Sequence, residues 1–64
     1  MISASVVWFD QLKGLGEALT DNGMTVFLRS NEIVPVENMF TGLTKGQEIS
    51  VELKNFHAIK IVRL

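Results

Sequence analysis

The sequence predicts an all-β fold, a five-stranded, partly open β-barrel formed by a single domain over residues 1–64. Three observations lead to this prediction. Apolar residues alternate with polar ones with a period of two, which is typical of strands that bury one face. Glycine and asparagine interrupt the alternation at short intervals, where tight turns are needed. Short strands that follow one another in a small domain, with no convincing helix, favour a barrel.

The N-terminal half is predicted to form a three-stranded meander. Residues 3–10 are rich in β-branched and aromatic side chains, which favour a strand. A turn over residues 11–14 leads to a second strand over residues 16–20. The dipeptide Asn22-Gly23 then supplies the positive φ angles of a tight hairpin. A third strand over residues 24–28 completes the meander.

The C-terminal half is predicted to add two strands after an irregular connection. Residues 30–34 form a short turn or one helical turn, and residues 35–46 hold the only proline and two of the five glycines. Residues 47–53 alternate cleanly between apolar and polar side chains, as a half-buried strand does. A turn at Lys54-Asn55 leads to the last strand, over residues 57–63.

One face of each strand is expected to form the barrel core. In the last strand, alternation places Ile59 and Ile61 on one face and Ala58, Lys60 and Val62 on the other. The predicted core consists of Val6, Ala18, Val26, Leu28, Ile33, Ile49, Val51, Leu53, Ile59 and Ile61.

Composition and charge exclude several classes of function. Six Lys and Arg against seven Asp and Glu give a net charge of −1, so the chain is neither a basic nucleic-acid arm nor a polybasic membrane anchor. It has no cysteine and one histidine, which argues against disulfides and a metal site. No apolar run approaches the ~20 residues that span a membrane, and the N-terminus lacks signal-peptide features. We therefore expect a soluble, cytoplasmic protein that does not bind a membrane.

Neither a nucleotide cofactor nor catalysis is expected. Gly14 and Gly16 lie between two predicted strands, whereas phosphate-binding loops need a helix after the glycines; they are better explained by a sharply twisted hairpin. The spacing of the carboxylates does not indicate a hydrolase, and we find no nucleophile with a base. His57, which stands alone, is interpreted as a surface or capping residue. The sequence thus predicts a non-enzyme with no cofactor and no bound metal.

Four segments, in order along nearly the whole chain, resemble the cold-shock domain family. VVWFD followed by KGLG (residues 6–16) is similar to the family's opening V-K-W-F-N-x-x-K-G-F-G-F-I. VFLRS (residues 26–30) stands where the family has V-F-V-H-F. LTKGQEISV (residues 43–51) and the end of the chain (residues 58–64) resemble L-x-x-G-Q-x-V-x-F and A-x-N-V-x-K-L. The resemblance implies a five-stranded, OB-fold-like Greek-key β-barrel of the cold-shock type.

The resemblance also implies binding of single-stranded DNA or RNA. In the family, aromatic side chains on the first three strands stack with unpaired bases, and basic residues around them meet phosphates. Trp8 and Phe27 fall on two of these aromatic positions, although by themselves they could also be core residues. The alternation places Phe27 outward, between the inward Val26 and Leu28. The implied nucleic-acid-binding residues are Trp8, Phe9, Lys13, Phe27, Arg29, Phe40 and Lys60.

The chain departs from the family on this surface. Leu15, Glu17 and Ser30 replace aromatic residues of the two motifs. Because stacking contributes ~1–3 kcal/mol per base, three lost positions remove roughly 3–9 kcal/mol. Arg29 offsets part of this loss, since a guanidinium can stack on a base and meet a phosphate, while the carboxylate of Glu17 opposes phosphate binding.

Two hypotheses follow for the function. In the first, the chain is a small single-strand-binding protein of phage or mobile-element type, whose weak sites act cooperatively. In the second, the face has lost nucleic-acid binding and docks a protein partner or a second copy as a homodimer. Val7 and Leu15 would then be the apolar anchors.

Overall fold

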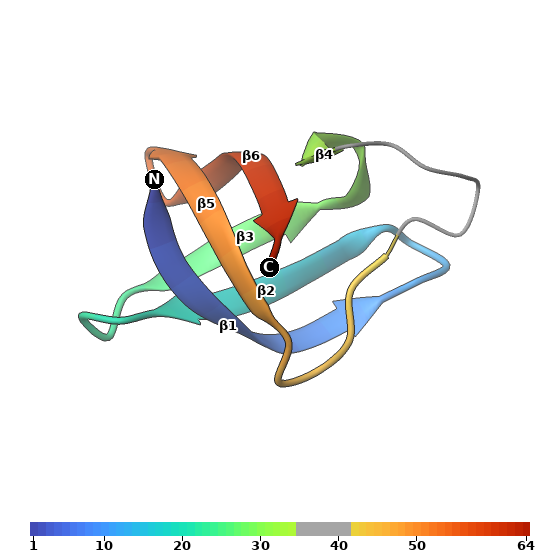
Figure 1. Ribbon diagram of the computed structural model, residues 1–64. Helices are drawn as coiled ribbons and strands as arrows, with labels where there is room; N and C mark the ends of the chain where they lie inside the picture. The colour runs from blue at the N-terminus through green and yellow to red at the C-terminus, as the bar shows by residue number, and fades with distance from the viewer. Residues whose placement is uncertain (35–41) are drawn as a thin grey trace.

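The computed structural model describes residues 1–34 and 42–64. Its elements are β1 (Ile2–Asp10), β2 (Leu15–Thr20), β3 (Thr25–Arg29), the short 3-10 helix η1 (Ser30–Glu32), β4 (Ile33–Val34), β5 (Glu48–Lys54) and β6 (His57–Arg63) (Figure 1). Every boundary of the five predicted strands lies within one residue of the observed boundary. The segment 30–34, predicted as a turn or one helical turn, contains η1 and then the two-residue strand β4. In the described residues, no helix has the length and apolar character needed to cross a membrane.

The strands form one closed barrel, which confirms the predicted five-stranded, OB-fold-like architecture. β1 lies between β2 and β5, β2 pairs with β3, and β5 pairs with β6, all antiparallel. A parallel pairing between Phe27 on β3 and His57 on β6 closes the cylinder. β4 extends the sheet by pairing in parallel with β6. In Figure 1 the long strands therefore wrap around a common interior.

The turn between β2 and β3 forms at the predicted Asn-Gly dipeptide. Only one of the two predicted positive φ angles is found: Gly23 has a φ of 86°, in the region that glycine adopts without steric cost, whereas Asn22 does not have a positive φ. The backbone N–H of Thr20 donates to the carbonyl of Met24 at 2.8 Å. The Thr20 hydroxyl accepts from the Met24 N–H at 3.0 Å and donates to the side chain of Asn22. Local sequence chemistry is thus sufficient to place this hairpin.

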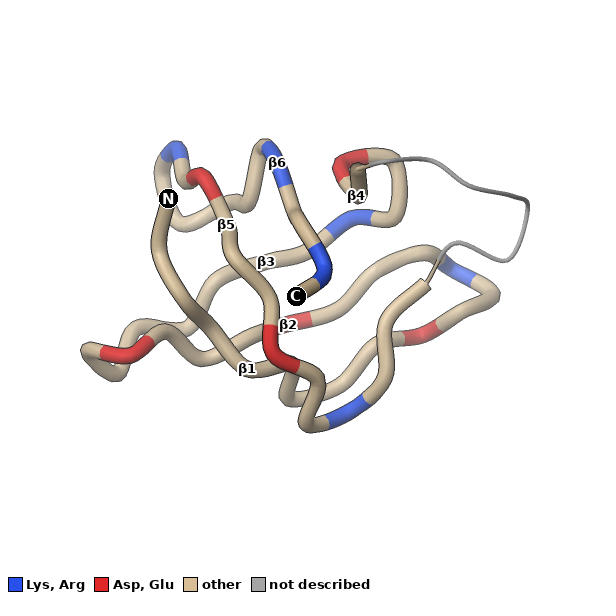
Figure 2. The backbone as a smooth tube through the Cα atoms, in the orientation of Figure 1, with Lys and Arg blue, Asp and Glu red and all other residues tan. Residues whose placement is uncertain are grey.

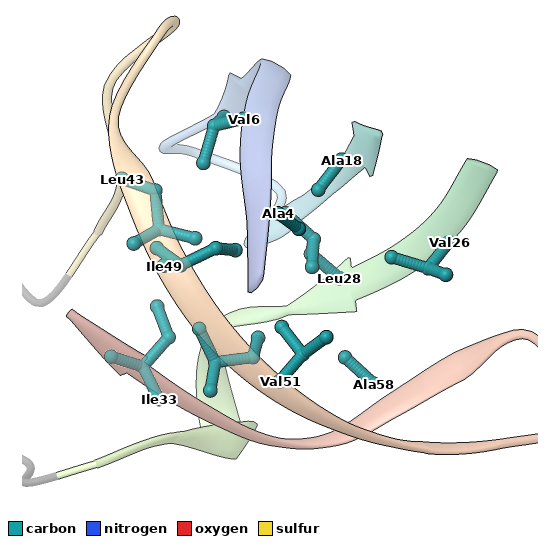
Figure 3. Packing of buried hydrophobic residues seen from close by; sticks show 11 residues of the cluster. Ala4, Val6, Ala18, Val26, Leu28, Ile33, Leu43, Ile49, Val51 and Ala58 are labelled. Atoms are coloured by element: carbon teal, nitrogen blue, oxygen red, sulfur yellow. The ribbon is translucent and has the colours of Figure 1, made fainter. Parts of the chain in front are cut away.

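The barrel interior is a single apolar core in which side chains from all five long strands meet (Figure 3). Most of the predicted core is confirmed. The predicted residues found buried are Val6, Ala18, Val26, Leu28, Ile33, Ile49, Val51 and Ile61. Ala4, Leu43 and Ala58 are also buried, and Leu53 is partly buried against the cluster.

The placements of Ile59 in the core and of Ala58 on the opposite face were both wrong, because β6 contains an irregularity. Its register with β5 shifts so that Glu52 pairs with Lys60 and Leu53 pairs with Ala58. Ile59 is left without a cross-strand partner and is 40% exposed. An extra residue of this kind reverses the alternation locally. Ala58 and Ile61 therefore both face the interior, although in a regular strand residues at positions i and i+3 point to opposite faces.

The turn between β5 and β6 is formed by Asn55 and Phe56, one residue later than predicted. Both residues have positive φ angles, 52° for Asn55 and 66° for Phe56, as a two-residue hairpin loop requires. Asparagine tolerates this conformation, whereas an aromatic residue is disfavoured there. The backbone carbonyl of Phe56 accepts a hydrogen bond of 2.9 Å from the N–H of Phe27, so the strained turn also helps to close the barrel.

Replacement of Phe56 by glycine is expected to raise the free energy of unfolding by about 1 kcal/mol, because glycine relieves the left-handed strain at some entropic cost. Denaturant unfolding followed by far-UV circular dichroism measures the change. Phe56→Ala is the matched control, since it removes the ring and keeps the Cβ atom that causes the strain. A gain in Phe56→Ala equal to that in Phe56→Gly would contradict this explanation.

Candidate nucleic-acid interface

Trp8 and Phe27 both lie on the outer face of the barrel. On β3, regular alternation buries Val26 and Leu28 and leaves Phe27 48% exposed, as predicted. On β1, the register with β2 shifts between Val6 and Trp8, so Trp8 pairs with Glu17 and is 43% exposed. The two rings are thus surface residues, and the alternative that they are core aromatics does not hold.

A row of four side-chain positions crosses this face. Trp8 on β1 pairs with Glu17 on β2, Glu17 pairs with Phe27 on β3, and Phe27 pairs with His57 on β6. The Phe27 and His57 rings are in contact, with centroids 5.3 Å apart and planes tilted by 31°. In the neighbouring row, Leu15 pairs with Arg29. The strand pairings therefore gather two aromatic rings, an imidazole and a guanidinium on one surface.

A pocket of about 270 Å³ lies between the two rows. Its lining residues are Trp8, Leu15, Gly16, Phe27, Leu28, Arg29 and His57. The volume is close to the lower end of the ~300–1,000 Å³ typical of ligand pockets. A shallow apolar pocket of this size with flat aromatic walls suits a planar ring better than an extended chain.

The polar groups around the pocket are tied to one another. The indole N–H of Trp8 donates to Glu17 Oε1 at 2.7 Å, which restrains the orientation of the indole. Arg29 forms an ion pair with Glu32, with Nη2 and Oε1 3.4 Å apart. Both partners are accessible to water, so this pair contributes little to stability and leaves the guanidinium able to exchange partners.

The structure brings only some of the predicted site residues together at the pocket. Trp8, Phe27 and Arg29 line the pocket together. Two predicted residues are exposed but do not line the pocket. Lys13 lies in the turn between β1 and β2, and Lys60 lies on β6, where it pairs with Glu52 of β5. Figure 2 accordingly shows the basic residues spread over several elements of the chain. Phe40 lies outside the described residues.

Phe9 was among the implied nucleic-acid-binding residues, but it packs against the core. It is half-buried and lies opposite Gly16, whose position leaves room for its ring. A Cβ atom on Gly16 would lie 2.6 Å from Phe9 Cδ1. The backbone of β1 turns Phe9 inward because the preceding shift of register places Trp8 outward.

His57 is a polar pocket residue that the sequence analysis did not assign to the site. It was interpreted as a surface or capping residue, and it does lie on the surface. Its contact with Phe27 arises only from the pairing that closes the barrel, so no local pattern around residue 57 could have indicated it. Across residues 1–34 and 42–64, no group of three or more His, Asp or Glu side chains is placed to hold a metal ion.

The fold and this face together define a small OB-fold-like barrel with an exposed aromatic pocket on β1, β2 and β3. No protein-family model matches the chain. A search of curated proteins also found no match. The site must therefore be interpreted from its own chemistry.

Proposed function

We propose that this protein binds single-stranded DNA or RNA by stacking unpaired bases on Trp8 and Phe27. The observation that carries the proposal is that these two rings are exposed together and line one pocket on β1–β3. This is the face of an OB-fold barrel that binds oligonucleotides. Four segments, two of which contain Trp8 and Phe27, resemble the cold-shock domain family, and this resemblance favours the same binding face. The proposed role needs no cofactor and no catalytic group.

Arg29 is the basic residue to which we assign a direct role. It lines the pocket beside Phe27, where a guanidinium can stack on a base or meet a phosphate. Lys13 and Lys60 lie farther along the surface and would meet the flanking backbone. Two stacking rings contribute roughly 2–6 kcal/mol, which is weak for an isolated site. We therefore expect several chains to bind cooperatively along one strand.

Phe27→Ala is expected to weaken binding of a short oligothymidine by roughly 5- to 150-fold, because one stacking ring is worth ~1–3 kcal/mol. The measurement is quenching of Trp8 fluorescence during titration, at low and at moderate salt. Binding that involves phosphate contacts weakens as salt is added. Leu12→Ala is the matched control, since Leu12 is 99% exposed in the β1–β2 turn and lies outside the pocket.

A flat fluorescence signal at both salt concentrations would overturn the proposal. If a sizing experiment on the same sample then showed a dimer, the second hypothesis would be favoured. Val7 and Leu15 are large apolar side chains that stay exposed on β1 and β2, as anchors of a protein interface must be in the isolated chain. If Phe27→Ala kept the affinity of the wild-type chain and still showed saturable quenching, the oligonucleotide would bind at a site other than the pocket.

A further inference from the structure

Glu17 is an acidic residue within the row formed by Trp8, Glu17, Phe27 and His57, the surface that we call the aromatic face. It is partly buried on β2, and its backbone pairs with Trp8 on one side and with Phe27 on the other. The carboxylate is fixed by the hydrogen bond of 2.7 Å from the Trp8 indole to Oε1. If only the phosphates of a nucleic acid contacted this face, the carboxylate would weaken binding, since it carries the same sign of charge as the phosphates.

Within the described part of the chain, much of the hydrogen-bonding capacity of this carboxylate is unused. An ionised carboxylate is purely an acceptor, with about four lone-pair sites, and the Trp8 indole occupies one. Within residues 1–34 and 42–64, the ion pair that forms joins Arg29 to Glu32 and does not involve Glu17. No further hydrogen bond to the Glu17 side chain is found in that part of the chain. The free lone pairs can thus accept from a ligand on the face.

A base that stacks on Trp8 or Phe27 presents its edge beside Glu17, because Glu17 is the cross-strand neighbour of both rings. Single-stranded bases are commonly distinguished by hydrogen bonds to their Watson–Crick edges. Guanine carries two adjacent donors there, N1–H and the N2 amino group, which match the two oxygens of a carboxylate. Thymine and uracil carry one N–H between two carbonyl oxygens, and these oxygens repel a carboxylate. Cytosine and adenine offer an amino donor beside a ring nitrogen acceptor.

We infer that Glu17 reads the edge of a stacked base and makes the face selective for guanine over thymine or uracil. This inference rests on the proposed function and deepens it. The bond from Trp8 orients the carboxylate for the contact, and the donors of guanine compensate the charge that would otherwise oppose binding. A charge-assisted, bidentate contact is the strongest kind of hydrogen bonding available to this side chain.

The test compares a short oligothymidine with the same oligomer carrying one central guanine. The wild-type chain is expected to bind the guanine oligomer about tenfold more tightly, from the typical discrimination of a bidentate base contact. Glu17→Gln keeps an oxygen acceptor for Trp8 but replaces the second oxygen with an amino donor. In this variant the ratio of the two affinities is expected to fall close to one, with tighter binding of the oligothymidine. Glu52→Gln on β5 is the matched control, because it makes the same charge change at an exposed position outside the pocket.

The outcomes separate this inference from the proposed function. If Glu17→Gln tightens binding of both oligomers by the same factor, the carboxylate acts only by repulsion; the inference is then overturned while the proposed function stands. Equal affinity of the wild-type chain for the two oligomers overturns it as well. Absence of binding to either oligomer contradicts the proposed function itself.

Discussion

Replacement of Ile61 by alanine is expected to lower the free energy of unfolding by about 2–5 kcal/mol. Ile61 is fully buried, and its backbone pairs with Ile33 on β4 and with Val51 on β5. Truncation would leave a cavity where three strands meet. A chain of 64 residues has a total stability of only about 3–10 kcal/mol, so this change removes a large part of it.

The measurement is denaturant unfolding followed by far-UV circular dichroism, in which the midpoint shifts while the slope is unchanged. Ile59→Ala provides the matched control, since it removes the same atoms from an exposed side chain two residues earlier on β6. Its expected cost is below about 1 kcal/mol, because surface changes have small effects. Equal losses in the two variants would mean that Ile59 faces the core and that the irregularity in β6 is not formed.

Replacement of Gly16 by alanine is expected to cost about 1–3 kcal/mol through overpacking and to weaken binding at the pocket. A Cβ atom at this position would lie 2.5 Å from the backbone carbonyl oxygen of Trp8 and 3.0 Å from the Cα atom of Phe9. Because these are backbone atoms, β1 must move away from β2. That movement displaces Trp8, which lines the pocket.

Gly42→Ala is the control for this prediction. The three heavy atoms nearest to a Cβ atom on Gly42 all belong to the end of the Gln11 side chain, which can rotate away. The expected cost is about 1 kcal/mol or less, from the hydrogen bond between Gln11 Nε2 and the carbonyl of Leu43. Unfolding experiments on both variants, with oligonucleotide titration of the folded proteins, test the difference. A Gly16→Ala variant as stable as Gly42→Ala would contradict the close approach of β1 and β2.

The strands were predictable because their signals are local. An alternating pattern specifies which side chains of a strand face inward, so Val26 and Leu28 could be assigned to the core and Phe27 to the surface. The Asn22-Gly23 turn could be placed from its own chemistry. The prediction failed for Ile59 because a bulge depends on the partner strand. The extra residue in β6 is defined by its register with β5, and nothing in residues 57–63 indicates it.

Alternation predicted only part of the candidate site. It placed Phe27 outward on β3, and Arg29, two residues later, lies on the same face and lines the same pocket. Trp8 was assigned to this face by the resemblance alone, because regular alternation after the buried Val6 would turn it inward; the register shift in β1 exposes it. His57 was not assigned to it, since its contact with Phe27 joins residues far apart in the chain. Phe9 was included among the nucleic-acid-binding residues, whereas the shifted register of β1 turns it toward the core.

The sequence by itself determined the all-β class, the order and limits of the five long strands, and most of the buried residues. These features depend on neighbours within a few residues, and the hydrophobic period and turn residues specify them directly. Only the tertiary structure decided the closure between β3 and β6, the irregularities in β1 and β6, and the contacts of His57 and Glu17 on the aromatic face. Each of these depends on the register between separate strands, and register is set by the packing of the whole barrel.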